Sequence, residues 1–130
     1  MDAHVRVLVA DDEEDIRLLV CLALRRAGCT VVAAVEDGAQ ALAAARAQRP
    51  DVVVLDVAMP GVAGLEVCEA LRADPDPELA GCRVLLLSAG ASSDDVARGL
   101  AAGADAYLPK PFTIAGLIAE VRELTARPRV

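Results

Sequence analysis

The 130-residue chain has very few aromatic side chains and almost no lysine. Tryptophan is absent, and Tyr107, Lys110 and Phe112 are each the only residue of their kind. The hydrophobic core therefore has to be built from valine, leucine, isoleucine and alanine. Because all three rare residues fall in one stretch, A-Y-L-P-K-P-F at 106–112, that stretch is a candidate for function as well as for packing.

Other absences exclude several classes of protein. The net charge is −7 and no basic run occurs, so we expect no direct binding of nucleic acid by this domain. No apolar run is long enough to cross a membrane, and the first residues lack the features of a signal peptide. The four cysteines (Cys21, Cys29, Cys68 and Cys82) show no metal-ligand spacing, which indicates reduced thiols and a cytoplasmic location.

What the chain does contain is an alternation of two kinds of segment. Short apolar, β-branched stretches at 5–10, 30–35, 52–55 and 83–87, and a weaker one at 106–108, are typical of strands buried on both faces. Between them, apolar spacing predicts helices over 16–24, 39–48, 65–72, from a cap at Ser92 or Ser93, and over 114–126. Pro75 and Pro77 are expected to end the third helix.

This order predicts an α/β fold: a doubly wound, five-stranded parallel sheet between two layers of helices. The length allows a single domain spanning 1–130, with a frayed tail at about 127–130.

Polar residues follow four of the predicted strands. Asp11 and Asp12 follow the first strand, Asp56 the third, Ser88 the fourth and Lys110 the fifth. Each alone has an ordinary explanation, such as capping a helix or forming a turn. Because the carboxyl ends of parallel strands meet at one edge of the sheet, we expect all five side chains to lie close together.

The chemistry of this group indicates phosphoryl transfer. Clustered carboxylates raise one another's pKa unless a cation relieves them, and magnesium prefers hard oxygen ligands. A carboxylate can also accept a phosphoryl group as a nucleophile. We predict that Asp56 is the phosphoacceptor and that Asp11, Asp12 and Asp56 bind magnesium, with manganese as the alternative ion. Lys110 and Ser88 are predicted to contact phosphoryl oxygens.

Four motifs match a known family in order along the chain. They are D-D at 11–12, L-D-x-x-M-P-G-x-x-G at 55–64, S-A at 88–89 and Y-L-P-K-P-F at 107–112. Together they resemble the receiver domain of bacterial two-component response regulators, over essentially the whole chain. The resemblance implies the flavodoxin-like strand order 2-1-3-4-5 and a signalling domain that is not an enzyme, although it assists its own phosphorylation and dephosphorylation. It also implies a phosphorelay in which a histidine kinase or histidine phosphotransfer protein supplies the phosphoryl group.

The same resemblance implies further residue roles. The backbone carbonyl of Ala58 is expected to bind the metal, the backbone of Ala89 to contact the phosphoryl group, and the Lys110–Pro111 peptide bond to be cis. Ser88 and Tyr107 are expected to form the switch, with the tyrosine ring outward without phosphate and inward with it. The surface of the fourth predicted helix and the fifth strand would then change, and would bind an unknown effector protein or a second copy of the chain.

Three positions differ from the pattern that the family often shows. Ala63 replaces an acidic residue that is common before Gly64, and the other two lie nearer the chemistry. Ala58 and Gly90 are small where larger or polar side chains are common. Both are expected to border the path of the water that hydrolyses the acyl phosphate. We therefore expect the phosphoryl lifetime to reflect the lack of a side chain that orients this water. Phe112 is expected to pack in the core, and His4 to have no chemical role.

Three alternative classes of protein share some of these features. A magnesium-dependent phosphatase of the haloacid dehalogenase type also uses an aspartyl phosphate, but needs a second aspartate where this chain has Ala58. A flavodoxin-like electron carrier needs a hydroxyl- and glycine-rich loop where this chain has D-D-E-E-D at 11–15. A degenerate receiver that acts only as a binding module would not need the full set of strand-end residues.

Overall fold

The computed structural model describes residues 5–90 and 92–126; His4 and the tail at 127–130 lie outside this range. Five strands form one parallel sheet in the order β2-β1-β3-β4-β5. They are β1 (Arg6–Ala10), β2 (Thr30–Val35), β3 (Val52–Asp56), β4 (Arg83–Ser88) and β5 (Ala106–Pro109). The predicted parallel sheet and its strand order are confirmed.

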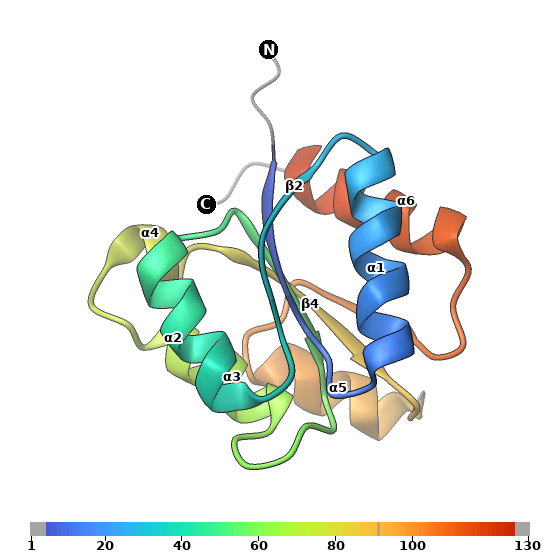
Figure 1. Ribbon diagram of the computed structural model, residues 1–130. Helices are drawn as coiled ribbons and strands as arrows, with labels where there is room; N and C mark the ends of the chain where they lie inside the picture. Colours follow the sequence, from blue (N-terminus) through green and yellow to red (C-terminus); the bar gives the residue numbers. More distant parts are fainter. Residues whose placement is uncertain (1–4, 91, 127–130) are drawn as a thin grey trace.

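Helices cover both faces of the sheet (Figure 1). One face carries α1 (Glu14–Arg26) and α6 (Ile114–Ala126), which lie side by side. The other face carries α2 (Gly38–Gln48), α3 (Gly64–Arg72), α4 (Pro77–Ala80) and α5 (Ser93–Ala101). The three-layer architecture predicted from the alternation of segments is therefore confirmed.

The sheet is buried because its strands present apolar side chains to both helix layers. All five residues of β3 are buried. In β1, Val7 and Val9 pack with the core beneath α1 and α6, whereas Leu8 and Ala10 pack with the core on the opposite face. This is the alternation expected of a strand, whose successive side chains point to opposite faces.

The short helix α4 was not predicted. The sequence analysis treated Pro75 and Pro77 only as the end of the preceding helix. In the structure, Pro77 lies in the first turn of α4, and the Asp76 side chain accepts the Glu78 N–H at 3.0 Å. Proline suits that position because the first helical N–H has no partner within the helix. The same proline that cannot continue α3 therefore begins a new helix.

Two helix starts follow the capping rules. The Asp37 side chain accepts the Gln40 N–H at 2.8 Å at the start of α2. Ser92, one of the two caps proposed from the sequence, accepts the Asp95 N–H at 3.1 Å at the start of α5. These caps fix where the two helices begin relative to the strands before them.

None of the four cysteines, all of which are described, forms a disulfide, as expected. Cys21, Cys68 and Cys82 are buried, and Cys29 is half-buried. Burial raises the pKa of Cys68 to about 11. A thiol with such a pKa is almost fully protonated at neutral pH and unreactive, so Cys68 serves as a small core residue.

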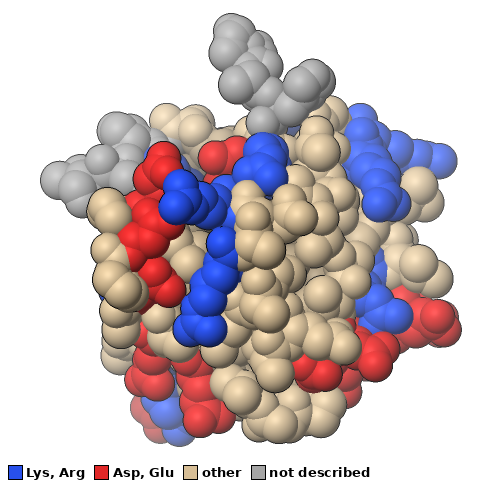
Figure 2. All heavy atoms as spheres, turned by 60° about the vertical axis from the view of Figure 1, so that its left-hand side comes forward, with Lys and Arg blue, Asp and Glu red and all other residues tan. Residues whose placement is uncertain are grey.

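The molecular surface carries mixed charge. On the face shown in Figure 2, acidic side chains lie beside the basic ones. Ion pairs join α2 to the segment before α4, with 3.5 Å between Arg46 and Asp74 and 2.8 Å between Arg49 and Asp76. Among the residues described, none of the helices has the length and apolar character that crossing a bilayer requires.

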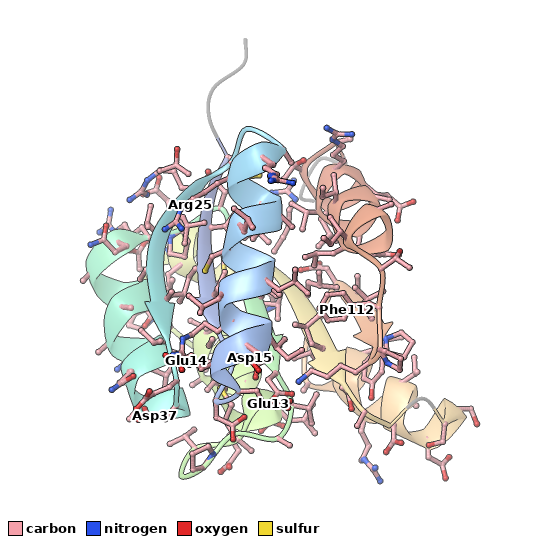
Figure 3. All side chains as sticks on the ribbon, turned by 45° about the vertical axis from the view of Figure 1, so that its right-hand side comes forward. Glu13, Glu14, Asp15, Arg25, Asp37 and Phe112 are labelled. Carbon is pink, nitrogen blue, oxygen red and sulfur yellow. The ribbon has the colours of Figure 1, made fainter. Side chains whose placement is uncertain are left out.

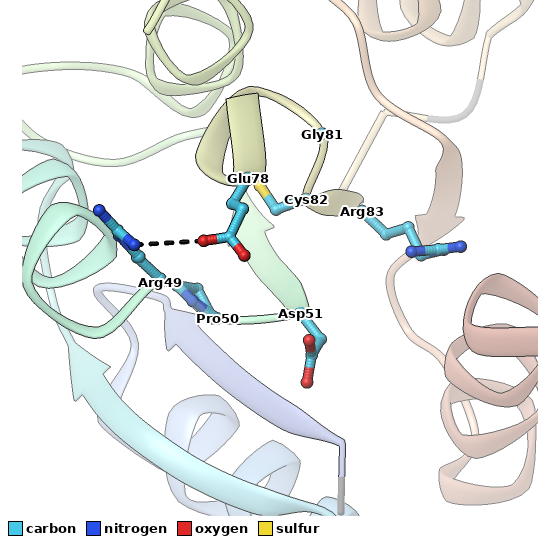
Figure 4. A pocket seen from close by; sticks show the side chains of 7 residues that line it. All are labelled: Arg49, Pro50, Asp51, Glu78, Gly81, Cys82 and Arg83. Atoms are coloured by element: carbon cyan, nitrogen blue, oxygen red, sulfur yellow. Dashed lines mark hydrogen bonds and ion pairs between the residues drawn. The ribbon is translucent and has the colours of Figure 1, made fainter. Parts of the chain in front are cut away.

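A small pocket of about 220 Å³ lies beside the amino-terminal ends of β3 and β4 (Figure 4). An ion pair of 3.2 Å between Arg49 and Glu78 lies on its lining. It is lined by Arg49–Asp51, Glu78 and Gly81–Arg83. The pocket is thus at the opposite end of the sheet from the polar residues singled out in the sequence.

Candidate functional site

The predicted site residues meet at the carboxyl edge of the sheet. Asp11 and Asp12 directly follow β1, and Asp56 and Ser88 are the last residues of β3 and β4. Lys110 follows β5. Ion pairs from Lys110 to Asp11 and Asp56 show that the sheet brings these segments together. The expectation that these strand ends bring their polar residues together is therefore confirmed.

Three carboxylates form a compact acidic group. Asp11, Asp12 and Asp56 each offer one oxygen, and these atoms all lie within 4.8 Å of one another. Asp11 and Asp56 are buried, whereas Asp12 is exposed. The group therefore has two fixed members and one that faces solvent, which leaves an open approach for an ion or a substrate.

One oxygen of this group lacks a normal partner. Asp11 Oδ1 accepts the Glu13 N–H at 2.9 Å. Asp11 Oδ2 is buried and accepts no hydrogen bond from the described residues, although Lys110 Nζ lies 3.2 Å away as an ion-pair partner. A buried carboxylate oxygen without a hydrogen bond is costly, and a hard divalent cation would satisfy it. The residues present therefore fit a magnesium-type ion.

The electrostatics of Asp56 reflect this crowding. The pKa of Asp56 is raised to about 6, chiefly by burial and next by the nearby charge of Asp11. The charge of Lys110 and a hydrogen bond from the Ala58 backbone N–H act in the opposite direction, and a hydrogen bond with Asp12 adds to the rise. A divalent cation beside these carboxylates would favour the ionised form of Asp56.

Lys110 is the cation of the site. Its Nζ lies 3.2 Å from Asp11, 3.4 Å from Asp56 and 2.9 Å from Glu13. Burial lowers the pKa of Lys110, but the hydrogen bond to Glu13 and the nearby charges of Asp11 and Asp56 outweigh burial, so the pKa is raised. The ammonium group therefore stays charged under ordinary conditions. The Lys110–Pro111 peptide bond is cis, the isomer expected from the sequence.

Glu13 is a site residue that the sequence analysis missed. It occupies the N-cap of α1, but its side chain makes no capping hydrogen bond and instead accepts one from Lys110 at 2.9 Å. The available signal was the residue type, because N-caps favour the short side chains of Ser, Thr, Asp and Asn. A glutamate at the N-cap, beside the Asp11-Asp12 pair, therefore indicates a role other than capping the helix.

Ser88 and Tyr107 both bind the backbone of Gly90. The Ser88 hydroxyl accepts the Gly90 N–H at 3.0 Å, and the Tyr107 hydroxyl donates to the Gly90 carbonyl. The tyrosine ring is half-buried and packs against the core between the sheet and α2–α5. The ring therefore lies inward. The expected change of its position between the chain without phosphate and the phosphorylated chain stays a prediction. The hydrogen bond to Gly90 and the contacts with the core favour this inward position.

The space over Gly90 is occupied by a side chain from α5. A Cβ atom at Gly90 would lie 2.5 Å from Asp95 Oδ2 and 3.7 Å from Ser88 Oγ. Asp95 is held there by an ion pair with Arg98. A larger side chain at position 90 would therefore have to displace Asp95. The expected dependence of the phosphoryl lifetime on Ala58 and Gly90 stays a prediction. Ala58 is exposed, which is consistent with a small side chain that leaves the approach of water open.

The remaining residues of the A-Y-L-P-K-P-F stretch have simpler roles. Phe112 is half-buried and packs with the core beneath α1 and α6, which confirms the predicted packing role (Figure 3). Ala89, expected to offer its backbone to a phosphoryl group, is exposed at the end of β4.

Comparisons with known proteins agree with this fold and site. A family model described as the response regulator receiver domain matches residues 7–122. The chain therefore belongs to the receiver-domain family of two-component response regulators, a class of signalling domains. These proteins receive phosphate from histidine kinases and act on downstream targets. The predicted class of protein is confirmed, and the phosphatase alternative is not favoured.

Individual relatives are close in sequence and in structure. The transcriptional regulatory protein PrrA of Mycobacterium tuberculosis is 48% identical over 122 residues, which are 94% of this chain and 50% of PrrA. The chain thus spans about half the length of this relative. Among solved structures, the signal receiver domain of NarL from Mycobacterium tuberculosis superposes with a TM-score of 0.88 at 37% identity, covering 97% of this chain and all of that one. The chemotaxis response regulator CheY4 of Vibrio cholerae gives 0.86 at 34% identity, over 94% of this chain and 99% of that one.

Proposed function

We propose that Asp56 accepts a phosphoryl group from the phosphohistidine of a histidine kinase or histidine phosphotransfer protein. An Asp56 carboxylate oxygen attacks phosphorus, the phosphorus–nitrogen bond breaks, and the histidine nitrogen keeps the electron pair and takes up a proton. An acyl phosphate on Asp56 results. The observation that carries this proposal is the meeting of Asp11, Asp12 and Asp56 with a single ammonium, Lys110, at the edge of the sheet.

We propose that Asp11, Asp12 and Asp56 hold magnesium, with the Ala58 backbone carbonyl as a further ligand and manganese as a substitute ion. The buried Asp11 oxygen that accepts no hydrogen bond from the described residues and the all-oxygen donor set support this assignment. When bound, the ion offsets the charge that builds up on the transferred group.

The protein's other polar groups are proposed to bind the phosphoryl oxygens. Lys110 supplies a compact charge that already lies 3.4 Å from Asp56. The Ser88 hydroxyl, at the end of β4, and the backbone N–H of Ala89, the next residue, lie at the same edge and would donate hydrogen bonds to the other oxygens. These donors act in a partly buried setting, where each is stronger than it would be in water.

The output is proposed to be a change of surface at α5 and β5. A phosphoryl group that draws the Ser88 hydroxyl inward would break its hydrogen bond with the Gly90 N–H. The segment from Ser88 to Gly90 would shift, and with it the carbonyl that holds Tyr107. Gly90 lies shortly before α5 and Tyr107 lies on β5, so a shift of this segment would reach both elements. This supports α5 and β5 as the surface that changes.

The partners and the setting follow as proposals from the family. A downstream effector protein, or a second phosphorylated copy of the chain, would bind the surface of α5 and β5. We propose that residues 1–130 act as a single receiver domain in the cytoplasm. PrrA, which is about twice as long, is a transcriptional regulatory protein, but this domain itself is proposed to bind neither nucleic acid nor membrane.

The domain is further proposed to catalyse loss of its own phosphoryl group. Water attacks phosphorus, the bond to the Asp56 oxygen breaks, and inorganic phosphate leaves. The small side chain of Ala58 supports open access for this water, whereas Asp95 limits the space over Gly90. The rate at which the chain loses its phosphoryl group is expected to change in the double variant Ala58→Asn plus Gly90→Glu. The second substitution also displaces Asp95. An unchanged rate would contradict this part.

Incubation with acetyl phosphate and magnesium, followed by intact mass measurement, tests the function. The wild type is expected to gain one phosphoryl group, and Asp56→Asn to gain none. Wild-type protein without an adduct would indicate a receiver that only binds a partner. An adduct that persists in Asp56→Asn would place the acceptor elsewhere.

A further inference from the structure

Glu13 is the exposed member of the group of carboxylates around Lys110. Its Oε1 lies 2.9 Å from Nζ, closer than the oxygens of Asp11 at 3.2 Å and Asp56 at 3.4 Å. Figure 3 shows Glu13 at the amino-terminal end of α1. The contact joins the segment after β1 to the segment after β5, on the two sides of the proposed phosphorylation site.

This contact is not explained by the start of the helix. Glu13 is the N-cap of α1, yet its side chain makes no capping hydrogen bond. Its own N–H donates to Asp11, so the backbone at this point is already held. Within the described chain, the ammonium of Lys110 is the one partner of the Glu13 side chain. The side chain is therefore committed to Lys110.

A phosphoryl group on Asp56 would require this arrangement to change. The Lys110 ammonium has three N–H donors and faces three carboxylates. To bind a phosphoryl oxygen, it has to give up a partner. Leaving Asp11, which is fully buried, would strand a charge without water. Glu13 is 61% exposed, so water can solvate it after release.

We propose that Glu13 is a positioning residue that holds Lys110 at the site and competes with the phosphoryl group for it. The proposal rests on the proposed function, because it assumes that a phosphoryl group on Asp56 takes Lys110 as a partner. In the resting chain, Glu13 keeps the ammonium over the carboxylates. In the phosphorylated chain, Glu13 releases it to solvent-exposed phosphoryl oxygens. The strength of this one exposed ion pair thus sets how tightly the site holds a phosphoryl group.

Beryllofluoride, a phosphoryl mimic that binds to carboxylates, tests the competition. Titration with saturating magnesium can be followed by the fluorescence of Tyr107, the only tyrosine in a chain without tryptophan. Glu13→Ala is expected to bind beryllofluoride about two- to fivefold more tightly than wild type, the fold-change that matches an exposed ion pair.

Glu14→Ala is the matched control. It removes the same charge at the first residue of α1, where the structure gives the side chain no hydrogen bond or ion pair within the described residues. Glu14→Ala is expected to leave the affinity for beryllofluoride close to that of wild type. An equal gain in both variants would show a general effect of charge and overturn the role of Glu13.

A second background tests whether Glu13 acts through Lys110. In Lys110→Met, adding Glu13→Ala is expected to leave the affinity for beryllofluoride unchanged. The ammonium for which Glu13 and beryllofluoride compete is absent from this variant. A gain of the same size as in the wild-type background would contradict the proposal. Structural disturbance of α1 would persist in both backgrounds, so this cycle separates the two explanations.

Failure of the proposed function gives a different result. If the wild type itself binds no beryllofluoride in the presence of magnesium, Asp56 is not an acceptor site and both proposals fall. If the wild type binds it and Glu13→Ala behaves like wild type, only the role of Glu13 is overturned.

Discussion

Lys110 Nζ lies 3.4 Å from Oδ1 of Asp56, which links the end of β3 to the segment after β5. The charge of Lys110 lowers the pKa of Asp56, but not enough to cancel the effects that raise it. Burial and the charge of Asp11 outweigh it, and the pKa of Asp56 rises to about 6. The site therefore holds a carboxylate that is less stable in its ionised form than an ordinary aspartate, and this has measurable consequences.

The first prediction is that Asp56→Asn stabilises the fold at about pH 7.5 in the absence of divalent cations. With a native pKa of about 6 and an ordinary value of 3.8, the native state binds a proton more tightly than the unfolded state. Stability is therefore lost as the pH rises from about 4 to 6. The neutral amide avoids this loss, on the order of 3 kcal/mol. Thermal unfolding should show a higher Tm for the variant, with a difference that shrinks toward pH 4.

Glu123→Gln provides the control for this measurement. It removes the same charge from an exposed position on α6 and should leave Tm nearly unchanged at either pH. A lower Tm for Asp56→Asn than for wild type at about pH 7.5 would contradict the raised pKa.

The second prediction concerns magnesium. Millimolar magnesium should raise the Tm of the wild type, because an ion that binds only the native state stabilises it. Asp12→Asn should lose most of this rise, since Asp12 supplies the exposed carboxylate of the acidic group. Glu14→Gln should retain it. An equal rise in both variants would show that magnesium binds elsewhere.

The third prediction concerns the packing of the Tyr107 ring against Gly99. A Cβ atom at Gly99 would lie 2.9 Å from Leu86 Cδ1 and 3.1 Å from Tyr107 Cδ2. Gly99→Ala should therefore move the ring outward and break its hydrogen bond to Gly90. Quenching of tyrosine fluorescence by acrylamide should increase.

Gly116→Ala in α6 serves as the comparison, because the nearest atom there is the hydroxyl of Thr113 at 3.0 Å and not the tyrosine. Quenching should be the same as in wild type. If Gly99→Ala also leaves the quenching unchanged, the ring is not held by this packing.

The fourth prediction concerns Arg72, which ties α3 to the segments before β4 and β5. Its guanidinium donates to the carbonyls of Gly103 and Ala80 at 2.8 Å each, to the Cys82 carbonyl, and to Asp105 at 2.8 Å. A lysine cannot supply this planar set of donors. Arg72→Lys should lower the free energy of unfolding by about 2 kcal/mol, measured with urea. Arg26→Lys, an exposed position on α1, should change it by less than about 0.5 kcal/mol.

The sheet and the place of the site could be predicted from the sequence because both depend on patterns along the chain. Apolar runs marked each strand, and the topology then brought Asp11, Asp56 and Lys110 to one edge. The helix α4 was missed because proline both ends and begins helices, so Pro77 was ambiguous without the cap that Asp76 supplies.

The contacts that the sequence did not reveal are choices among side-chain conformers. Glu13 reaches Lys110 across the site, and Asp95 fills the space over Gly90 from a separate helix. Tyr107 lies inward because the Gly90 carbonyl and the core together favour that position. Each depends on the distance between segments that only the folded chain defines, so residue type and spacing could not decide them.

The proposed function requires that phosphorylation forms an acyl phosphate on Asp56. After incubation with acetyl phosphate and magnesium, borohydride reduces such an acyl phosphate to an alcohol and converts the aspartate to homoserine. Peptide mass mapping should then find homoserine at position 56 and at no other aspartate. Homoserine at another position, or none in protein that has gained a phosphoryl group, would contradict the account.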